Sequence, residues 1–163
     1  MNAPVRAPIK FDVQGLVQAV AQNHTNDAFS PTLTTSQWDM LGSYLQPFAV
    51  AQGQTLIEEG GSDRTLYLIE SGSLSVHYED HKGRVRLAIV QPGSAVGEGA
   101  FFTGQPRSAS VQAGSASKIW CMTPMRFTEL RNRHPEVALE MAMALGSLVS
   151  RRLANRPRRI AVT

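Results

Sequence analysis

The chain has 163 residues, of which 42% are hydrophobic and 18% are charged, as is normal for a globular protein with one core. The net charge is +3, and five arginines fall in the last thirteen positions, so the basic character belongs to the C-terminal end. The one cysteine, Cys121, excludes an internal disulfide and fits a reducing compartment.

The first residues do not resemble a targeting sequence. Residues 1–9 contain two prolines and no long apolar run, which excludes a signal peptide. The longest apolar segment, residues 137–145, is interrupted by Glu140 and is too short to cross a bilayer. We therefore expect a cytoplasmic protein that does not bind a membrane.

Two helices are predicted before any strand. From Phe11 to Gln22, apolar residues recur with helical spacing. A second helix begins near Thr35, which we take as its N-cap, and places Trp38, Leu41 and Leu45 on one face. We expect these side chains to pack rather than to bind a ligand, and we assign residues 1–34 to an N-terminal tail and helix.

Between Pro47 and Met122 the sequence consists of short β-rich runs separated by glycines. This pattern predicts a sandwich or a barrel. The predicted strands are residues 48–51, 55–58, 66–70, 73–78, 85–91, 108–112 and 116–122. His77 and His81 flank two carboxylates at one hairpin tip, but residues on a strand turn need not converge, so we predict a solvated tip and no metal site.

The stretch from Gly93 to Ala113 contains the candidate binding residues. Gly97 and Gly99 flank Glu98, and glycines let backbone N–H groups approach a ligand closely. If a short helix starts there, its free N–H groups form an anion site.

Arg107, nine residues after Glu98, adds a planar fork of donors suited to a phosphate. Glu98 cannot bind that phosphate, but it can accept hydrogen bonds from sugar hydroxyls. Together the two residues indicate a nucleotide bound by its sugar and its phosphate. The alternative is a surface loop in which Glu98 and Arg107 only pair with each other.

Two helices are predicted after the strands: residues 124–133, and a longer one that starts at Pro135 and that Pro157 should end near Asn155. The longer helix has one apolar stripe, Val137, Met141, Leu145 and Leu148. It also has a line of small residues at i, i+4 spacing, Ala138, Ala142, Gly146 and Ser150. A helix with apolar or small residues on several faces is predicted to be buried on several sides. We therefore expect a homodimer through residues 135–156, with a monomer as the alternative.

The run Gly97-Glu98, eight residues, then Arg107-Ser108-Ala109-Ser110-Val111 resembles the phosphate-binding cassette of cyclic nucleotide-binding domains. That family includes the catabolite activator protein, the regulatory subunits of protein kinase A and cyclic nucleotide-gated channels. Residues 55–60 and 63–72 are similar to the opening strands of the family's β-barrel, and the resemblance covers about residues 35–155.

The resemblance implies an α+β fold, with an antiparallel β-barrel of jelly-roll (double-stranded β-helix) type flanked by N-terminal helices and a long C-terminal helix. It places a cyclic nucleotide-binding domain at residues 35–156, with the barrel at about 46–122 and the C-terminal helices at about 124–156. Residues 157–163 form a basic tail.

The resemblance implies a 3′,5′-cyclic purine nucleotide as the ligand. We expect cAMP, because bacterial members of the family favour it, with cGMP as the other possibility. Arg107, Ser108 and the N–H groups near Ala100 would bind the phosphate, and Glu98 the ribose 2′-hydroxyl. Val76 and Leu87 would line the barrel wall, and Arg152 would lie near the base. The implied ligand-binding residues are Gly97, Glu98, Gly99, Ala100, Arg107, Ser108, Ala109, Val76, Leu87 and Arg152. No catalytic residue, metal or cofactor is implied.

Gly99 departs from the family, which usually has leucine or isoleucine at this position. Residues 156–163 are too few for a helix-turn-helix domain, so we expect neither DNA binding nor catalysis. We expect a stand-alone sensor in which the last helix moves to regulate a partner protein. The alternatives are a degenerate domain that serves as an interaction module or binds another nucleotide such as cyclic di-GMP, and a nucleic-acid accessory protein that uses the basic tail.

Overall fold

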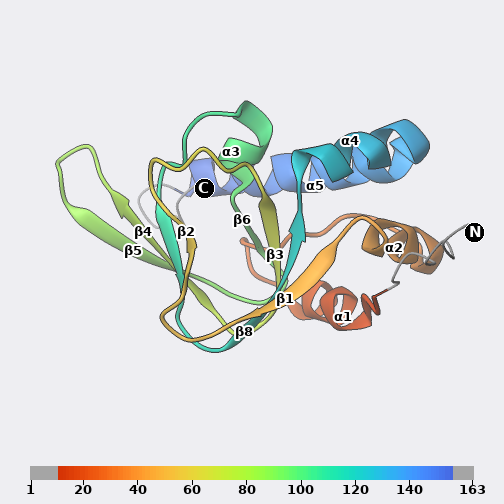
Figure 1. Cartoon of the computed structure of the whole chain (residues 1–163), viewed down its shortest axis with the longest axis horizontal. Coiled ribbons are helices and arrows are strands. Elements are labelled where there is room, and N and C mark those ends of the chain that lie inside the picture. The colour runs from red at the N-terminus through yellow and green to blue at the C-terminus, as the bar shows by residue number, and fades with distance from the viewer. Residues whose placement is uncertain (1–10, 156–163) are drawn as a thin grey trace, which may run out of the picture.

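The computed structural model describes residues 11–155, and the expectations for residues 1–9 and 157–163 lie outside this range. Figure 1 shows the arrangement of the elements. The helices are α1 (Gln14–Gln22), α2 (Thr35–Gly42), α3 (Glu98–Thr103), α4 (Pro124–Arg133) and α5 (Pro135–Ala154). The strands are β1 (Gln46–Val50), β2 (Thr55–Ile57), β3 (Leu66–Ser71), β4 (Leu74–Glu79), β5 (Val85–Val90), β6 (Ala95–Val96), β7 (Ser110–Ala113) and β8 (Ser117–Met122).

The strands form two antiparallel four-stranded sheets, in the orders β1-β8-β3-β6 and β2-β7-β4-β5. The α+β fold with antiparallel strands and a long C-terminal helix is confirmed. The strand pairings of the described residues give two sheets rather than one closed barrel. Every predicted strand overlaps an observed one, and β6 was not predicted.

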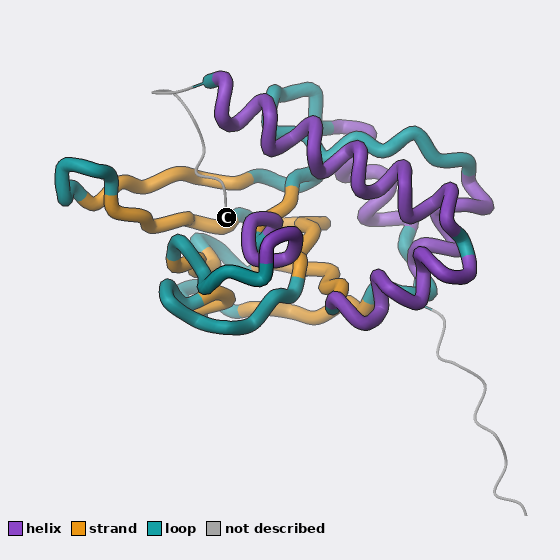
Figure 2. Tube along the Cα trace, turned by 90° about the horizontal axis from the view of Figure 1, so that it is seen from above, coloured by secondary structure: helices purple, strands orange, loops and turns teal. Residues whose placement is uncertain are grey.

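The first sheet is covered on both faces, because the side chains that alternate along its strands pack against the second sheet on one face and the helices on the other. On β3, Tyr67 and Ile69 belong to the core between the two sheets, together with residues of the second sheet such as Val76. Leu66 and Leu68 point the other way and pack with the helices. The first sheet is therefore the central layer, and Figure 2 shows most of the helices gathered on one side of the strands, with one short helix among the strands.

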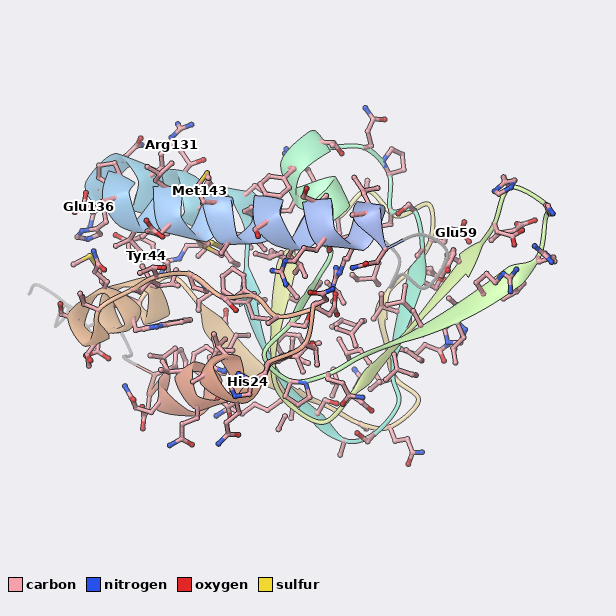
Figure 3. The ribbon with its side chains drawn as sticks, turned by 180° about the vertical axis from the view of Figure 1, so that it is seen from behind. His24, Tyr44, Glu59, Arg131, Glu136 and Met143 are labelled. Carbon is pink, nitrogen blue, oxygen red and sulfur yellow. The ribbon has the colours of Figure 1, made fainter. Side chains whose placement is uncertain are left out.

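Two helices, α2 and α4, begin where a side chain satisfies one of their first N–H groups. Thr34, not Thr35, is the N-cap of α2, and it forms a capping box with Gln37. Thr123 caps α4 by accepting a hydrogen bond from the N–H of Arg126. At the junction of α4 and α5, the His134 ring makes an edge contact with Tyr44, which follows α2 (Tyr44 is labelled in Figure 3).

Helix α5 buries the predicted apolar stripe, Val137, Met141, Leu145 and Leu148. The predicted line of small residues is not one surface, because Ala138 is buried whereas Gly146 and Ser150 are exposed. The exposed stripe consists of Leu139, Met143, Gly146, Ser150 and Leu153, at alternating spacings of four and three residues. We call this set the outer stripe of α5 (Met143 is labelled in Figure 3). It has the heptad spacing of a helix that pairs with another helix.

The β4–β5 hairpin extends away from the helices (Figures 1 and 2). Asp80 organises its tip by accepting hydrogen bonds from the side chains of Arg84 and Arg86.

Cys121 is half-buried on β8, and burial raises the pKa of its thiol, as expected for a packed cysteine rather than a nucleophile. In the described part of the chain, no helix combines the length and the apolar character that a membrane span requires.

Candidate functional site

The stretch singled out in the sequence forms a short helix between two glycines. Gly97 precedes α3 and Gly104 follows it, with φ of 87° and 72°, a region that side chains other than glycine rarely adopt. Gly97 also needs to be glycine for lack of space. A Cβ added there would lie 2.7 Å from Nη1 of Arg107 and 2.8 Å from the carbonyl oxygen of Thr65. The predicted helix is present, and its first glycine permits the close approach of Arg107.

Arg107 is held inside the protein by three groups from two segments, Gly97 before α3 and the loop that leads into β3. Its Nη1 donates to the carbonyl oxygen of Gly97 at 3.1 Å. Its Nη2 donates to Oδ2 of Asp63 at 2.8 Å and to the carbonyl oxygen of Thr65 at 2.7 Å. The side chain is 2% exposed, yet Nε has no hydrogen-bond acceptor among the described residues. An unsatisfied buried donor of this kind costs roughly 1–3 kcal/mol.

Asp63 partly neutralises Arg107 from the protein surface. Its side chain is 57% exposed, so the ion pair is screened by water on one side. Desolvation acts to raise the pKa of the Asp63 carboxyl, but hydrogen bonds from Arg107 and Thr65 outweigh it and lower the pKa below its ordinary value. Asp63 therefore stays ionised beside the guanidinium and helps to fix its orientation.

Glu98, the first residue of α3, is completely buried and accepts a hydrogen bond from Nη1 of Arg152 at 2.8 Å. The two charged residues of the cassette thus have different ion-pair partners, Asp63 for Arg107 and Arg152 for Glu98. Neither depends on the other for an opposite charge. The structure separates an arginine suited to an anion from a carboxylate held by the last helix.

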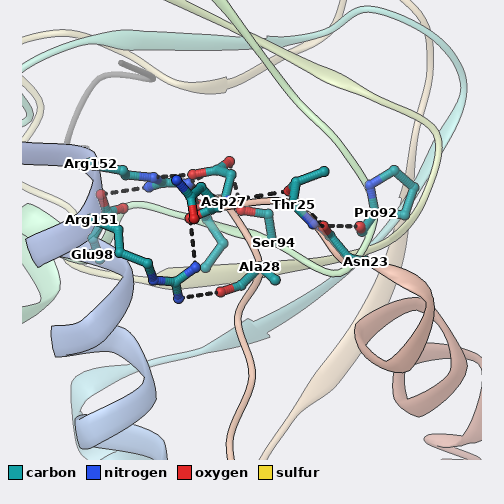
Figure 4. A network of polar contacts seen from close by, with 11 residues as sticks. Asn23, Thr25, Asp27, Ala28, Pro92, Ser94, Glu98, Arg151 and Arg152 are labelled. Carbon is teal, nitrogen blue, oxygen red and sulfur yellow. Dashed lines mark hydrogen bonds and ion pairs between the residues drawn. The ribbon is translucent and has the colours of Figure 1, made fainter. Parts of the chain in front are cut away.

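Arg152 is the centre of a buried polar network near the end of α5 (Figure 4). Asp27 accepts from its Nε at 2.6 Å and from its Nη2 at 3.1 Å. The same Nη2 also donates to Oγ of Ser94 and to the carbonyl oxygen of Ala95. Burial opposes the charge of Arg152, but the carboxylates of Glu98 and Asp27 outweigh it and raise the pKa of the guanidinium. Arg152 was expected near the base of a ligand, and it lies against Glu98.

The other predicted residues of the cassette differ in how far they are buried. Ala100 and Ala109 are buried next to the charged residues, whereas Ser108 is exposed. Gly99 is partly buried in the first turn of α3, where its carbonyl oxygen accepts a hydrogen bond from Thr103.

The expectation that Val76 and Leu87 line the same wall does not fit the register of the hairpin. Val76 pairs with Ala88, and Leu87 pairs with His77 on the other face of the sheet. Val76 is fully buried, and Leu87 is 58% exposed. Because the side-chain period of a strand is two, Ala88 is the β5 residue that shares the inner face with Val76.

Two carboxylates of the site were not predicted. Asp27 lies in the loop after α1, and Asp63 lies in the loop before β3. They meet arginines 125 and 44 residues away along the chain. Neither lies in a periodic pattern, so a single sequence has no local feature that marks them.

A cavity of about 550 Å³ lies away from these residues, between α1 and the end of β3. Its lining includes Gly15, Gln22, Glu70 and Pro92, and neither Glu98 nor Arg107. The charged residues of the cassette are instead almost fully covered in this conformation. Access of a ligand to them therefore requires a movement of the elements that cover them.

Two packed antiparallel sheets, a short helix after Gly97 and a buried arginine with an N–H group unsatisfied among the described residues are features suited to a small anionic ligand. The sequence profile described as "Cyclic nucleotide-binding domain" matches residues 47–134, more than half of the chain. The chain belongs to the cyclic nucleotide-binding domain family.

Three known proteins illustrate the similarity. The cAMP-activated global transcriptional regulator CRP of Salmonella typhimurium is 36% identical over 101 residues, which cover 61% of this chain and 46% of that protein. The catabolite activator protein of Thermus thermophilus has a TM-score of 0.66 at 28% identity, covering 75% of this chain and 56% of that one. A cyclic nucleotide-binding domain from Methylobacillus flagellatus has a TM-score of 0.75 at 20% identity, covering 91% and 84%. The chain spans about half the length of the curated regulator.

Proposed function

We propose that this domain is a cytoplasmic, non-enzymatic sensor that binds a 3′,5′-cyclic nucleotide at Arg107 and Glu98. The observation that supports this most strongly is the buried Nε–H of Arg107, which has no acceptor among the described residues. Buried donors are nearly always satisfied, and exceptions often mark functional sites. A phosphate oxygen would accept from Nε and balance a guanidinium whose one carboxylate partner is exposed to water. The N–H groups near Ala100 and the hydroxyl of Ser108 would add further donors.

Glu98 would accept a hydrogen bond from the ribose 2′-hydroxyl. In the present conformation its carboxylate is fully buried and bound by Arg152. The sugar must therefore share this carboxylate with Arg152 or displace it. Binding at Glu98 would then act directly on the end of α5.

We propose cAMP as the nucleotide. The support is the 36% identity to a regulator that is described as cAMP-activated. Val76 and Ala88 would contact the sugar and the base from the inner face of the second sheet. The alternative is a degenerate domain that serves as an interaction module or binds another nucleotide, such as cGMP or cyclic di-GMP.

Calorimetric titration of the full chain with cAMP, cGMP and cyclic di-GMP tests the ligand. We expect saturable binding of cAMP with one site per chain and weaker binding of the other two. Preference for cGMP would change the nucleotide but keep the site. Tight binding of cyclic di-GMP alone would support the alternative nucleotide, and no binding of any of the three would leave only the interaction module.

The output would be a change in the position of α5 that regulates a partner protein. A ligand can shift a helix only if it binds one arrangement more tightly than the other. Glu98 offers that difference, because Arg152 and the ribose use the same carboxylate. Direct sequence-specific DNA binding by the described residues is not part of this proposal.

The outer stripe of α5 would pair with the same stripe of a second copy. Leu139 and Met143 are 61% and 65% exposed, and no atom would lie within 4 Å of a Cβ added at Gly146, so another helix can approach closely. Sedimentation of the wild-type chain should give a dimer, and Met143→Glu should give a monomer. Met125→Glu, at a 73% exposed methionine on α4, is the matched control and should stay dimeric. A wild-type chain that sediments as a monomer with and without ligand would remove the dimer.

A further inference from the structure

One network joins three segments that are far apart in the sequence. The loop after α1 contributes Asp27, the stretch before α3 contributes Ser94, and the end of α5 contributes Arg152 (Figure 4). Arg152 is 3% exposed and Ser94 is 1% exposed, while the side chain of Asp27 is 13% exposed. These groups are thus largely shielded from water. In such surroundings the strength of an ion pair depends strongly on its geometry.

Asp27 determines the orientation of the guanidinium. Its two oxygens accept from Nε at 2.6 Å and from Nη2 at 3.1 Å, which is a bidentate pair. A guanidinium is planar and its N–H groups have fixed directions, so this pair sets the plane of the whole group. With that plane fixed, Nη1 is the nitrogen that donates to Glu98.

Asp27 is itself held in place by Ser94 and by a residue of its own loop. Its Oδ2 accepts from Oγ of Ser94 at 3.0 Å, and its backbone N–H donates to Oγ1 of Thr25 at 3.1 Å. Two residues further on, the N–H of Phe29 donates to the carbonyl oxygen of Gly93 at 2.8 Å. The loop after α1 is therefore fixed to the start of the cassette, so the position of Asp27 relative to Glu98 is defined by the fold.

The charges of the network have a consequence for Glu98. Arg152 is shared between two carboxylates, Asp27 and Glu98. If Asp27 lost its charge, the full attraction of the buried guanidinium would fall on Glu98. Arg152 would then hold Glu98 more tightly, or turn away from its present plane.

We propose that Asp27 is a positioning residue for sugar recognition, which keeps Arg152 oriented so that Glu98 can exchange a hydrogen bond with a ribose 2′-hydroxyl. This inference rests on the proposed binding of a cyclic nucleotide. Asp27 does not touch the nucleotide; it acts through Arg152. The loop after α1 is thereby part of the binding site, in addition to the cassette.

The test compares cAMP with 2′-deoxy-cAMP, which lacks the hydroxyl that Glu98 would accept. The ratio of their dissociation constants measures sugar recognition separately from phosphate binding. In the wild-type chain we expect 2′-deoxy-cAMP to bind about tenfold or more weakly, as for the loss of one hydrogen bond to a charged group. In Asp27→Asn we expect this ratio to fall to about threefold or less, since part of that hydrogen bond is lost.

Arg151→Gln is the matched control. Arg151 is adjacent on α5 and holds the same loop through the carbonyl oxygens of Asn26 and Ala28. It should keep the wild-type ratio. An equal fall of the ratio in Arg151→Gln would mean that Asp27 only docks the loop, which would overturn the inference.

A double-mutant comparison tests whether Asp27 acts through Arg152, and it also covers the case in which Asp27→Asn folds poorly. In an Arg152→Gln background, where the guanidinium that Asp27 orients is absent, Asp27→Asn should leave the ratio unchanged. A further fall there would contradict the mechanism. If the wild-type chain binds no cyclic nucleotide, the proposed function and this inference both fail. If it binds and Asp27→Asn keeps the full ratio, only this inference fails.

Discussion

The two charged residues of the cassette are held in different ways. Arg107 is held by neighbouring loops of the sheets, through Asp63 and two backbone carbonyls, and its Nε has no acceptor in the described part of the chain. Glu98 is held by Arg152 at the end of α5, 54 residues away. We call these the phosphate half and the sugar half of the site.

Because Arg107 and Glu98 are held by different parts of the fold, we expect the two halves to have different roles in binding. The phosphate half is held by groups near the sheets, and its one exposed carboxylate can stay in place when an anion arrives. The sugar half is complete only when α5 is in its present position. A ligand that binds both halves would therefore be anchored by the first and would act on α5 through the second.

Breaking the sugar half should have the largest effect on stability. Arg152→Gln leaves the buried carboxylate of Glu98 and the largely shielded carboxylate of Asp27 without their shared partner. Removing one member of a buried ion pair typically costs about 3–5 kcal/mol, so the free energy of unfolding should fall by about that amount. Urea unfolding measures it. Arg151→Gln, which loses bonds to two backbone carbonyls only, is the control and should cost less. Equal losses in the two variants would mean that the buried charges are not what links α5 to the cassette.

Breaking the phosphate half should mainly affect binding. Arg107→Ala would remove the proposed partner of the ligand phosphate, and such a loss costs about 2–5 kcal/mol, or roughly thirty- to several-thousand-fold in affinity. Calorimetry with cAMP measures the change. Arg64→Ala removes a nearby arginine that donates to the carbonyl oxygens of Ala100 and Phe101, and it should bind within a few-fold of wild type. An Arg107→Ala variant that binds as tightly as the parent would show that the pocket is assigned to the wrong residues.

The smallest expected effect is the pH dependence contributed by Asp63. Its pKa is lower in the folded protein than the ordinary value of 3.8, so its stabilising contribution is present above that value and is lost as the pH falls through the folded pKa. The carboxyl is more than half exposed, so we expect less than about 1 kcal/mol. Urea unfolding of wild type and Asp63→Asn should differ at pH 7 and converge towards pH 3. A difference that grows towards pH 3 would contradict the assigned pKa shift.

The sequence predicted the local features of both halves better than the contacts that join distant segments. Glycine spacing and apolar alternation are local, so they located the strands, the short helix after Gly97 and the candidate residues Glu98 and Arg107. The two-residue strand β6 is too short to show alternation. For Leu87, only the register with His77 shows which face of the sheet it occupies. The partners Asp27 and Asp63 depend on the tertiary fold, which no local pattern encodes.

The link between Glu98 and α5 is the central claim, and hydrogen exchange measures it most directly. Amide exchange across Pro135–Ala154 should be compared in the full chain with and without saturating cAMP. We predict a change concentrated in the last turns of α5 around Arg152, together with protection of the loop that contains Arg107. Unchanged exchange throughout α5 on saturation, with the Arg107 loop protected, would show that the nucleotide binds without acting on the helix and would contradict the account.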